Sequence, residues 1–235
     1  GLSFKDVFAQ AQTGGFRGIN VTYPYKEMVT AMVTVIDPLV RAIGAVNTVV
    51  FEAGGPKGFN TDYTGFMKAY RDVRGAQQPG IVCLIGTGGV GKAVAFGLVA
   101  LKAHTIRCVD LDPIKAVALA DALRALGSET VIEISTDAEE AAKGADGLIN
   151  CTPMGMVGIG GSALRSEAMQ GASWAFDAVY TPADTQFLQD AKQANLTIIS
   201  GYELFFGQGL DAWYIFTGID VNPSELRLAI QGEEL

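Results

Sequence analysis

The chain of 235 residues is 49% hydrophobic and 18% charged, so it can bury a sizeable core and is not expected to be disordered. Its net charge of −8, without a dense cluster of Lys and Arg, argues against a nucleic-acid-binding protein. Its apolar runs are short and interrupted by charges or glycine, well below the ~20 residues that a membrane-spanning helix needs, so we expect no membrane partner.

The first part of the chain, residues 1–77, mixes short apolar runs with polar turns. Its polar residues gather in three segments, GINVTYPYK at 18–26, IGAVNTVV at 43–50 and GFNTD at 58–62. Together these segments offer one Lys, one Asp and several uncharged hydrogen-bonding side chains, a set that suits a small polyol or a sugar-like acid. Each of these residues could equally satisfy backbone groups in a turn.

Strands and helices alternate in the middle of the chain, after a polar stretch with proline and glycine at 74–80. Strands are predicted at 81–86, 105–110, 130–135, 147–152, 174–180 and 196–200. Helices are predicted at 87–103, 113–127, 138–146 and 185–194. This alternation predicts a parallel sheet with helices on both faces.

Two further helices are predicted at 202–218 and 223–231, and we expect this tail to pack back on the first part of the chain. The predicted fold class is therefore α/β with two domains. A Rossmann-like, doubly wound parallel sheet would occupy residues 78–205. A smaller, discontinuous α/β substrate domain would occupy residues 1–77 and be completed by residues 206–235.

A glycine-rich turn follows the predicted strand at 81–86 and opens a helix, which is the context that a dinucleotide-binding motif requires. In this motif Gly86 would allow the tight turn, Gly88 would let backbone N–H groups reach a pyrophosphate, and Gly91 would let helix and strand pack closely. The helix N-terminus would add unpaired donors and partial positive charge. We therefore assign cofactor binding to Gly86, Thr87, Gly88, Gly89, Val90 and Gly91.

An acidic residue, Asp110, ends the second predicted strand of this part, about 20 residues after the motif, where a ribose-binding acid is expected. Its carboxylate would accept hydrogen bonds from the ribose hydroxyls and would repel a 2′-phosphate. Asp112 adds to that repulsion, and Lys115 is the only cation close by in the sequence. The sequence thus favours NAD over NADP.

Three cysteines, Cys83, Cys108 and Cys151, each lie in an apolar, strand-like stretch. We interpret them as buried free thiols, because their number is odd and no Cys-x-x-Cys pair occurs. With His104 the only histidine, the sequence offers no cysteine–histidine set for a metal ion, so we expect no metal. Free thiols and the lack of a visible signal peptide favour a cytoplasmic protein.

Seven segments in a fixed order resemble the shikimate dehydrogenases, and more narrowly the NAD-using quinate/shikimate dehydrogenase branch. They are GINVTYPYK at 18–26, IGAVNTVV at 43–50, GFNTD at 58–62, GTGGVG at 86–91, NCTPMGM at 150–156, DAVYTP at 177–182 and GYELFFGQG at 201–209. The resemblance extends from Gly15 to the end of the chain. The NVTxPxK and NTD patterns are far more specific than the glycine-rich turn.

The resemblance implies roles at matching positions. Lys26 would be the catalytic acid/base and Asp62 its partner. The substrate pocket would be lined by Thr22, Asn47, Asp62, Tyr180 and Gln208. The nicotinamide half of the cofactor would lie along Asn150, Thr152 and Gly201. The implied reaction oxidises the ring secondary alcohol of quinate, shikimate or both, which are hydroxylated cyclic carboxylates, to the 3-dehydro ketone with NAD.

One part of the family pattern is missing from the sequence. Members of the family begin with a strand and a Ser-x-Ser motif that binds the substrate carboxylate, and neither occurs here. We therefore expect a further N-terminal segment ahead of Gly1. Carboxylate recognition, quinate versus shikimate preference and the choice between monomer and homodimer stay open. So do two alternatives, a related dehydrogenase acting on another small molecule and a non-catalytic, truncated dinucleotide-binding remnant.

Overall fold

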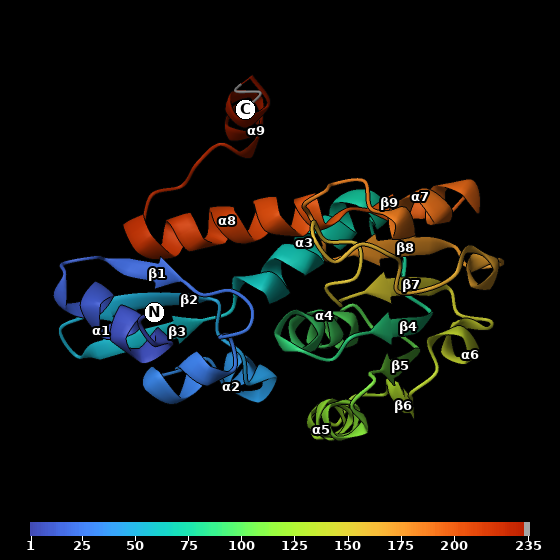
Figure 1. The fold of residues 1–235 in the computed structure, drawn as a ribbon, viewed down its shortest axis with the longest axis horizontal. Coiled ribbons are helices and arrows are strands. Elements are labelled where there is room, and N and C mark those ends of the chain that lie inside the picture. The colour runs from blue at the N-terminus through green and yellow to red at the C-terminus, as the bar shows by residue number, and fades with distance from the viewer. Residues whose placement is uncertain (233–235) are drawn as a thin grey trace.

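Two separate β-sheets define the architecture of the computed structural model, which describes residues 1–232. A three-stranded sheet lies toward one end of the long axis and a six-stranded sheet toward the other (Figure 1). Helices α3 (Thr61–Arg74) and α8 (Gly201–Thr217) extend from one sheet toward the other (Figure 1). The site described below is built where the two sheets approach each other.

The small sheet is antiparallel, in the order β1-β2-β3. Its unit comprises α1 (Phe4–Thr13), β1 (Gly18–Asn20), the 3-10 helix η1 (Met28–Met32), α2 (Pro38–Ile43), β2 (Thr48–Glu52) and β3 (Gly55–Phe59). The core of this unit is aliphatic and aromatic, with Phe8, Val29 and Val49 buried together. Ser3 and Asp6 form a capping box at the start of α1, which satisfies backbone donors that the helix leaves unpaired.

The large sheet is entirely parallel, in the order β6-β5-β4-β7-β8-β9. Its strands are β4 (Ile81–Ile85), β5 (Thr105–Val109), β6 (Val131–Ser135), β7 (Gly147–Asn150), β8 (Trp174–Asp177) and β9 (Thr197–Ile199). Each strand overlaps a strand predicted from the sequence. The predicted α/β, Rossmann-like, doubly wound class is confirmed.

Helices cover both faces of the large sheet. One face carries α3 (Thr61–Arg74), α4 (Gly89–Ala100) and α5 (Pro113–Arg124). The other face carries α6 (Ala138–Ala142), η2 (Ser166–Met169) and α7 (Gln186–Gln193). Helix α6 is shorter than predicted, because the chain leaves the helix at Lys143 and Gly144 takes a φ of 67°.

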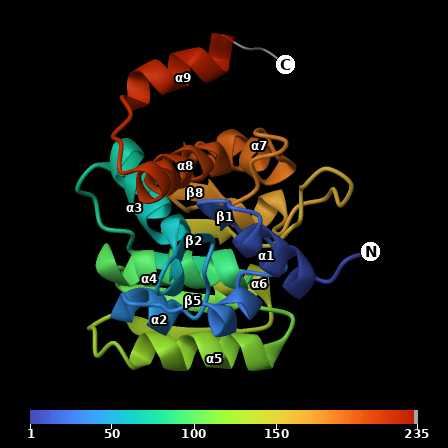
Figure 2. The same ribbon diagram turned by 90° about the vertical axis from the view of Figure 1, so that its left-hand side faces the viewer.

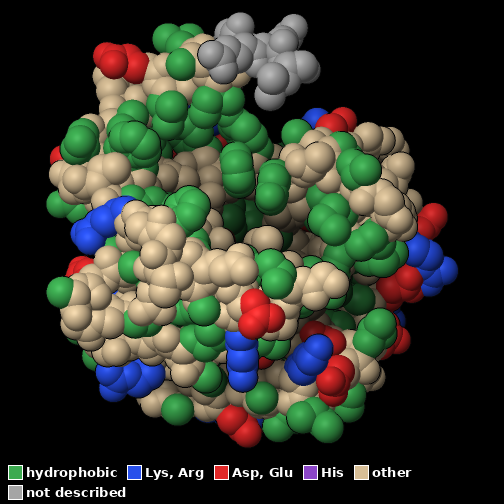
Figure 3. All heavy atoms as spheres, turned by 60° about the vertical axis from the view of Figure 1, so that its left-hand side comes forward, with side chains coloured by type: hydrophobic (Ala, Val, Ile, Leu, Met, Phe, Trp, Pro, Cys, Tyr) green, Lys and Arg blue, Asp and Glu red, His purple; other side chains and the backbone are tan. Residues whose placement is uncertain are grey.

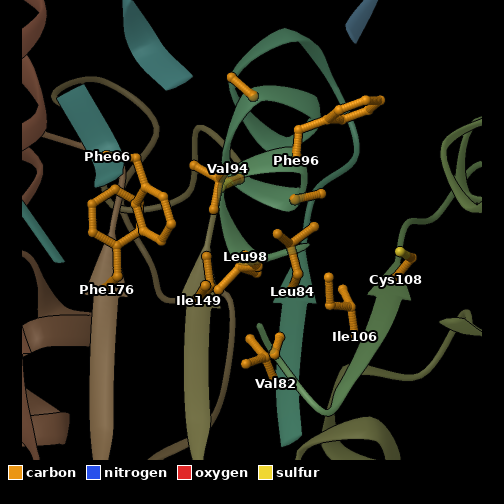
Figure 4. Close-up of a cluster of buried hydrophobic side chains, with 14 of the residues drawn as sticks. Phe66, Val82, Leu84, Val94, Phe96, Leu98, Ile106, Cys108, Ile149 and Phe176 are labelled. Carbon is orange, nitrogen blue, oxygen red and sulfur yellow. The ribbon is translucent and has the colours of Figure 1, made fainter. Parts of the chain in front are cut away.

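Alternating residues along each strand feed the two cores. On β4, Val82 and Leu84 belong to the core under α4, whereas Cys83 and Ile85 belong to the core under α6 and α7. Val94 and Leu98 of α4 point down onto the strands (Figure 4). This packing fixes α4, and therefore the glycine-rich turn at its start, relative to the sheet.

Helices α8 (Gly201–Thr217) and α9 (Pro223–Gly232) follow the last strand. Helix α8 crosses α3 closely, since a Cβ at Gly65 would lie 2.9 Å from the backbone nitrogen of Gln208. The far end of α8 reaches the small sheet, where Arg17 Nε donates to the carbonyl oxygen of Phe216 at 3.3 Å. Helix α9 stands above α8, to which it is tied by an ion pair between Arg227 and Glu203 (Figure 2).

The predicted domain boundary between residues 205 and 206 falls inside α8, which is a single helix. Residues 233–235 of the predicted substrate domain lie outside the described residues.

Candidate active site

Lys26 and Asp62 form a largely buried ion pair. Lys26 Nζ lies 2.6 Å from Asp62 Oδ2, and the two side chains are 16% and 5% exposed. Lys26 follows a turn closed by a hydrogen bond from Tyr25 N to Thr22 O, and its own carbonyl accepts from Val46 N at 2.8 Å. Asp62 lies in the first turn of α3. The pairing therefore depends on the small unit placing a turn against the start of a helix.

Asn60 fixes the start of α3 and thereby the direction of Asp62. Its side-chain Oδ1 accepts from the backbone nitrogens of Asp62 and Tyr63, and its Nδ2 donates to Ala45 O at 2.9 Å. An N-cap of this kind is typical of Asn. The amide thus ties the helix to the segment before Asn47.

A polar cluster continues from the ion pair through Asn47, Thr61 and Gln208. Asn47 Nδ2 donates to Thr61 Oγ1 at 2.9 Å, and Thr61 N donates to Asn47 Oδ1 at 2.8 Å. The Thr61 hydroxyl lies 3.3 Å from Gln208 Oε1 and can donate to it. The close crossing of α3 and α8 brings Gln208 to this position. Thr61 is not among the residues predicted from the sequence, although it lies between Asn60 and Asp62 in the NTD pattern.

Thr22 and Tyr180 reach the surface near different elements. Thr22 is exposed on the turn that carries Lys26. Tyr180 is 47% exposed and stacks on Phe205 of α8, with ring centroids 4.5 Å apart. Among residues 1–232, no hydrogen bond joins either side chain to the Lys26–Asp62 pair.

The glycine-rich turn packs its first and last glycines tightly and leaves the middle one open. Gly86 has a φ of 94°, and a Cβ there would lie 2.8 Å from the Cys151 carbonyl. A Cβ at Gly91 would lie 2.0 Å from Gly86 O, whereas nothing lies within 4 Å of a Cβ at Gly88. Gly88 is also the N-cap of α4 and offers no side chain to its first backbone donors. The start of α4 can therefore receive an anionic group.

Asp110 lies at the end of β5 and is held against this turn. Its Oδ2 accepts from Thr87 N at 2.9 Å and from Thr87 Oγ1 at 2.7 Å, and its Oδ1 accepts from Asp112 N at 3.0 Å. Partial burial opposes ionisation of Asp110, but these hydrogen bonds hold the pKa of its carboxyl below the usual value. A fixed negative charge therefore stands beside the glycine-rich turn.

Asn150 is fully buried, and its amide is saturated by internal hydrogen bonds. Its Oδ1 accepts from Thr152 N and Thr152 Oγ1, and its Nδ2 donates to Met154 O and to Asp177 Oδ1. The predicted cofactor contact Thr152 therefore belongs to a loop that Asn150 holds in place. Gly201 packs against the backbone that follows β8, because a Cβ there would lie 2.5 Å from Val179 O.

The strand order places these loops around one crevice. Strand β4 pairs with β5 on one side and with β7 on the other. Successive strands are added outward from β4 in one direction up to β6 and then, from β7 on, in the opposite direction, so the strand order reverses between β4 and β7. Ligands of doubly wound sheets bind at such a point, outside the carboxyl ends of the strands. The space-filling view is turned so that the end with the small sheet comes toward the viewer. It shows a hollow near the middle of this face, rimmed largely by hydrophobic side chains (Figure 3).

Comparison with curated proteins decides the family. The chain is 37% identical over 230 residues to a quinate/shikimate dehydrogenase (NAD(+)) of Corynebacterium efficiens, a match that covers 97% of this chain and 81% of that protein. The chain belongs to the shikimate dehydrogenase family. The family model for the shikimate dehydrogenase substrate binding domain matches residues 2–49. A second model, for coenzyme F420-dependent NADP oxidoreductases, matches residues 81–171.

Other members of the shikimate dehydrogenase family match equally broadly. A shikimate dehydrogenase (NADP(+)) of Pseudarthrobacter chlorophenolicus is also 37% identical, over 97% of this chain and 78% of that protein. Quinate dehydrogenase from Corynebacterium glutamicum, solved in complex with NAD, superimposes with a TM-score of 0.85 at 34% identity, covering 99% of this chain and 83% of that one. A Thermus thermophilus shikimate 5-dehydrogenase, solved with NADP(H) and shikimate, gives a TM-score of 0.84 at 31% identity, covering 97% and 83%.

Family membership confirms the recognition made from the motifs, and it identifies the chain as an oxidoreductase with a Rossmann-type dinucleotide-binding fold. The relatives carry both NAD and NADP in their names, so family membership alone does not decide between the two cofactors.

The three thiols of this shikimate dehydrogenase family member are buried and free, as predicted. Burial raises the pKa of Cys83 and Cys108 to about 12 and raises that of Cys151 well above its usual value. None of them is therefore a thiolate at neutral pH. Within residues 1–232, no helix is long and apolar enough to cross a bilayer, and no three His, Cys, Asp or Glu side chains gather to hold a metal ion.

Proposed function

We propose that this protein oxidises the ring secondary alcohol of quinate, shikimate or both to the 3-dehydro ketone, using NAD. The observation that carries the proposal is the Lys26–Asp62 pair, 2.6 Å apart and largely buried, beside the part of the glycine-rich turn where α4 begins. The proximity to that turn follows from Gly89, where a Cβ would lie 3.1 Å from Lys26 Cβ. An amine held next to a dinucleotide-type turn is suited to move the proton that accompanies hydride transfer.

In the proposed mechanism Lys26 is the acid/base. As a neutral amine it accepts the proton of the substrate hydroxyl, and as an ammonium it returns that proton in the reverse direction. Asp62 orients the amine toward the substrate, because its carboxylate is fixed by the start of α3. Such positioning lowers the barrier by removing freedom that the reacting groups would otherwise have to lose.

Substrate binding is assigned to polar side chains around this pair. Asn47, Thr61 and Gln208 form one hydrogen-bonded cluster and suit the hydroxyls of a polyol ring. Thr22 and Tyr180 are exposed on separate segments and are proposed to close on the substrate from two sides.

The cofactor is assigned to the crevice at the carboxyl ends of β4 and β7. The open Gly88 and the uncapped start of α4 fit a pyrophosphate, with Thr87, Gly89 and Val90 completing the turn. NAD, when bound, supplies the hydride acceptor. The Asp110 carboxylate supports NAD over NADP, since a fixed negative charge beside the ribose site repels a 2′-phosphate. Thr152 and Gly201 are proposed to border the nicotinamide side.

We further propose that the two sheets mark two functional units, residues 1–77 with 206–235 for the substrate and residues 78–205 for the dinucleotide. Two separate sheets support this division. The boundary inside α8 would make that helix a rigid connection between the units.

The experiment that tests the function is a two-by-two comparison of initial rates, with quinate or shikimate as substrate and NAD or NADP as oxidant. We expect turnover with NAD for at least one substrate and a lower kcat/KM with NADP. A protein that turns over neither substrate with either cofactor would contradict the proposed reaction. Higher kcat/KM with NADP would contradict only the assignment of NAD.

A further inference from the structure

The turn that carries Lys26 contacts the first turn of α4, the helix that packs on the large sheet. A Cβ added at Gly89 would lie 3.1 Å from Lys26 Cβ and 3.3 Å from Lys26 Cδ. The aliphatic stem of Lys26 therefore packs on bare backbone at the start of the helix. Any larger residue at position 89 would push the stem by a few tenths of an ångström.

The next residue along the chain makes a polar contact with the same helix turn. Glu27 Oε1 lies 3.2 Å from Lys92 Nζ, with the side chains 51% and 19% exposed. Lys92 occupies the first turn of α4, where the helix dipole disfavours a cation. The carboxylate of Glu27 offsets this cost, so the pair is favourable for the helix as well as for the turn.

This ion pair has a distinct place in the molecule. Within the part of the chain that the structure describes, no other ion pair or hydrogen bond joins residues 1–77 to residues 78–205. The polar contacts of Lys26 itself, with Asp62 Oδ2 and Val46 N, both lie within residues 1–77. Apolar packing of α3 on α4, with Phe66 against Gly97, sets the overall position of the two parts. The turn that carries Lys26 is held locally against the start of α4 by Gly89 and by the Glu27–Lys92 pair.

We propose that Glu27 and Lys92 are positioning residues for the dehydrogenase reaction, forming with Gly89 a clasp that holds the Lys26 amine in register with the dinucleotide site. The inference rests on the proposed role of Lys26. A half-exposed ion pair contributes little to global stability. Its effect is on alignment across the crevice, and small misplacements of a catalytic group reduce turnover steeply.

The test is a double-mutant cycle with Glu27→Gln and Lys92→Met in the full-length enzyme, measured with NAD and the better substrate. We expect each single variant to lower kcat roughly tenfold while the KM values change little, as for a displaced catalytic group. The double variant should be no worse than either single variant, because each change removes the same contact. Lys92→Arg keeps a cation at this place and should retain most of the turnover.

A matched control lies within the small unit. Glu52 and Lys57 form an ion pair of similar exposure that does not cross between the units, with Nζ and Oε2 2.6 Å apart. Glu52→Gln should therefore leave kcat unchanged. Thermal unfolding of all variants should differ little from that of the parent, which separates misalignment from loss of fold.

Two outcomes would overturn the clasp. Unchanged kcat in Glu27→Gln and Lys92→Met, with an active parent enzyme, would show that the contact does not position Lys26. A Lys92→Met variant that binds NAD weakly by calorimetry, beside a fully active Glu27→Gln variant, would assign Lys92 to the cofactor instead. An inactive parent would contradict the proposed function itself, so the two failures are distinguishable.

Discussion

Lys26 Nζ lies 2.6 Å from Asp62 Oδ2 although the two residues are 36 positions apart in the chain. The pair is largely buried, so each charge depends on the other. Removing one partner of such a pair leaves an uncompensated charge, which is more destabilising than removing both. The pair is therefore a structural as well as a chemical unit, and variants must be designed with that in mind.

Lys26→Met should reduce kcat by roughly two to four orders of magnitude, the range typical of losing a general acid/base, while substrate KM changes little. Steady-state kinetics with NAD measures this change. Because Asp62 then stays buried without its partner, the double variant Lys26→Met, Asp62→Asn serves as the control for stability. It should melt at a higher temperature than Lys26→Met and be equally inactive. Near-normal turnover in Lys26→Met would remove the amine from the chemistry.

The carboxylates at the end of β5 provide a test of cofactor choice. Asp110→Asn keeps an oxygen that can accept from Thr87 but removes the charge, so the ratio of kcat/KM for NADP to that for NAD should rise by roughly tenfold. Asp112→Asn is the matched change, because Asp112 caps α5 through Ile114 N and Asn can replace it as an N-cap. A cofactor ratio that moves equally in both variants, or in neither, would contradict a specific role for Asp110.

The sequence predicted the strands of the large sheet well, because each strand rests on local signals. Each buried strand is a short apolar run, and the glycine-rich turn stands where strand and helix meet. Contacts made only in three dimensions have no such local signal, and the pairing of Lys26 with Asp62 was expected from the family resemblance alone. The seating of Lys26 on Gly89 joins two units with different sheets, and nothing in the spacing of those residues shows it.

The hydrogen bonds around Asn150 are a second case in which a local motif does not show what a side chain contacts. The NCTPMGM motif drew attention to Asn150 and Thr152 as cofactor contacts. The structure shows that the Asn150 amide is buried and forms hydrogen bonds to Thr152, Met154 and Asp177. Whether a polar residue in a motif contacts a ligand or holds a loop depends on its burial, and burial at a strand end depends on the neighbouring strand.

The close approach at the end of the glycine-rich turn predicts a packing effect. Gly91→Ala would place a Cβ 2.0 Å from Gly86 O, so the turn must shift. We expect a loss of about 1–3 kcal/mol in the free energy of unfolding, as for overpacking, together with weaker NAD binding. Gly209→Ala on α8 is the control, because nothing lies within 4 Å of a Cβ there. That variant should be neutral or more stable by up to about 1 kcal/mol, the helix-propensity gain of Ala over Gly. Equal stability of both variants in urea titrations would contradict the packing argument.

Asp177 links the loop of Asn150 to the start of α7, and its burial predicts a pH effect on stability. Burial raises the pKa of Asp177 to about 6, although Thr185, Val179 and Asn150 all donate hydrogen bonds to its carboxylate. In the unfolded chain the pKa of this group is about 3.9. Between these two values the folded state binds more protons than the unfolded state, so the contribution of Asp177 to stability falls as pH rises from about 4 to 6.

Asp177→Asn should remove this dependence, because the amide oxygen can still accept from Asn150 and Val179 while no charge forms. The free energy of unfolding of the parent minus that of the variant, measured by urea titration at pH 4, 5, 6 and 7, isolates the contribution of this group from that of the other carboxylates. We expect the difference to decline by on the order of 2–3 kcal/mol between pH 4 and 6 and to stay level above pH 6, as linkage requires. A difference that is constant over this range would show that Asp177 ionises as readily in the folded protein as in the unfolded chain.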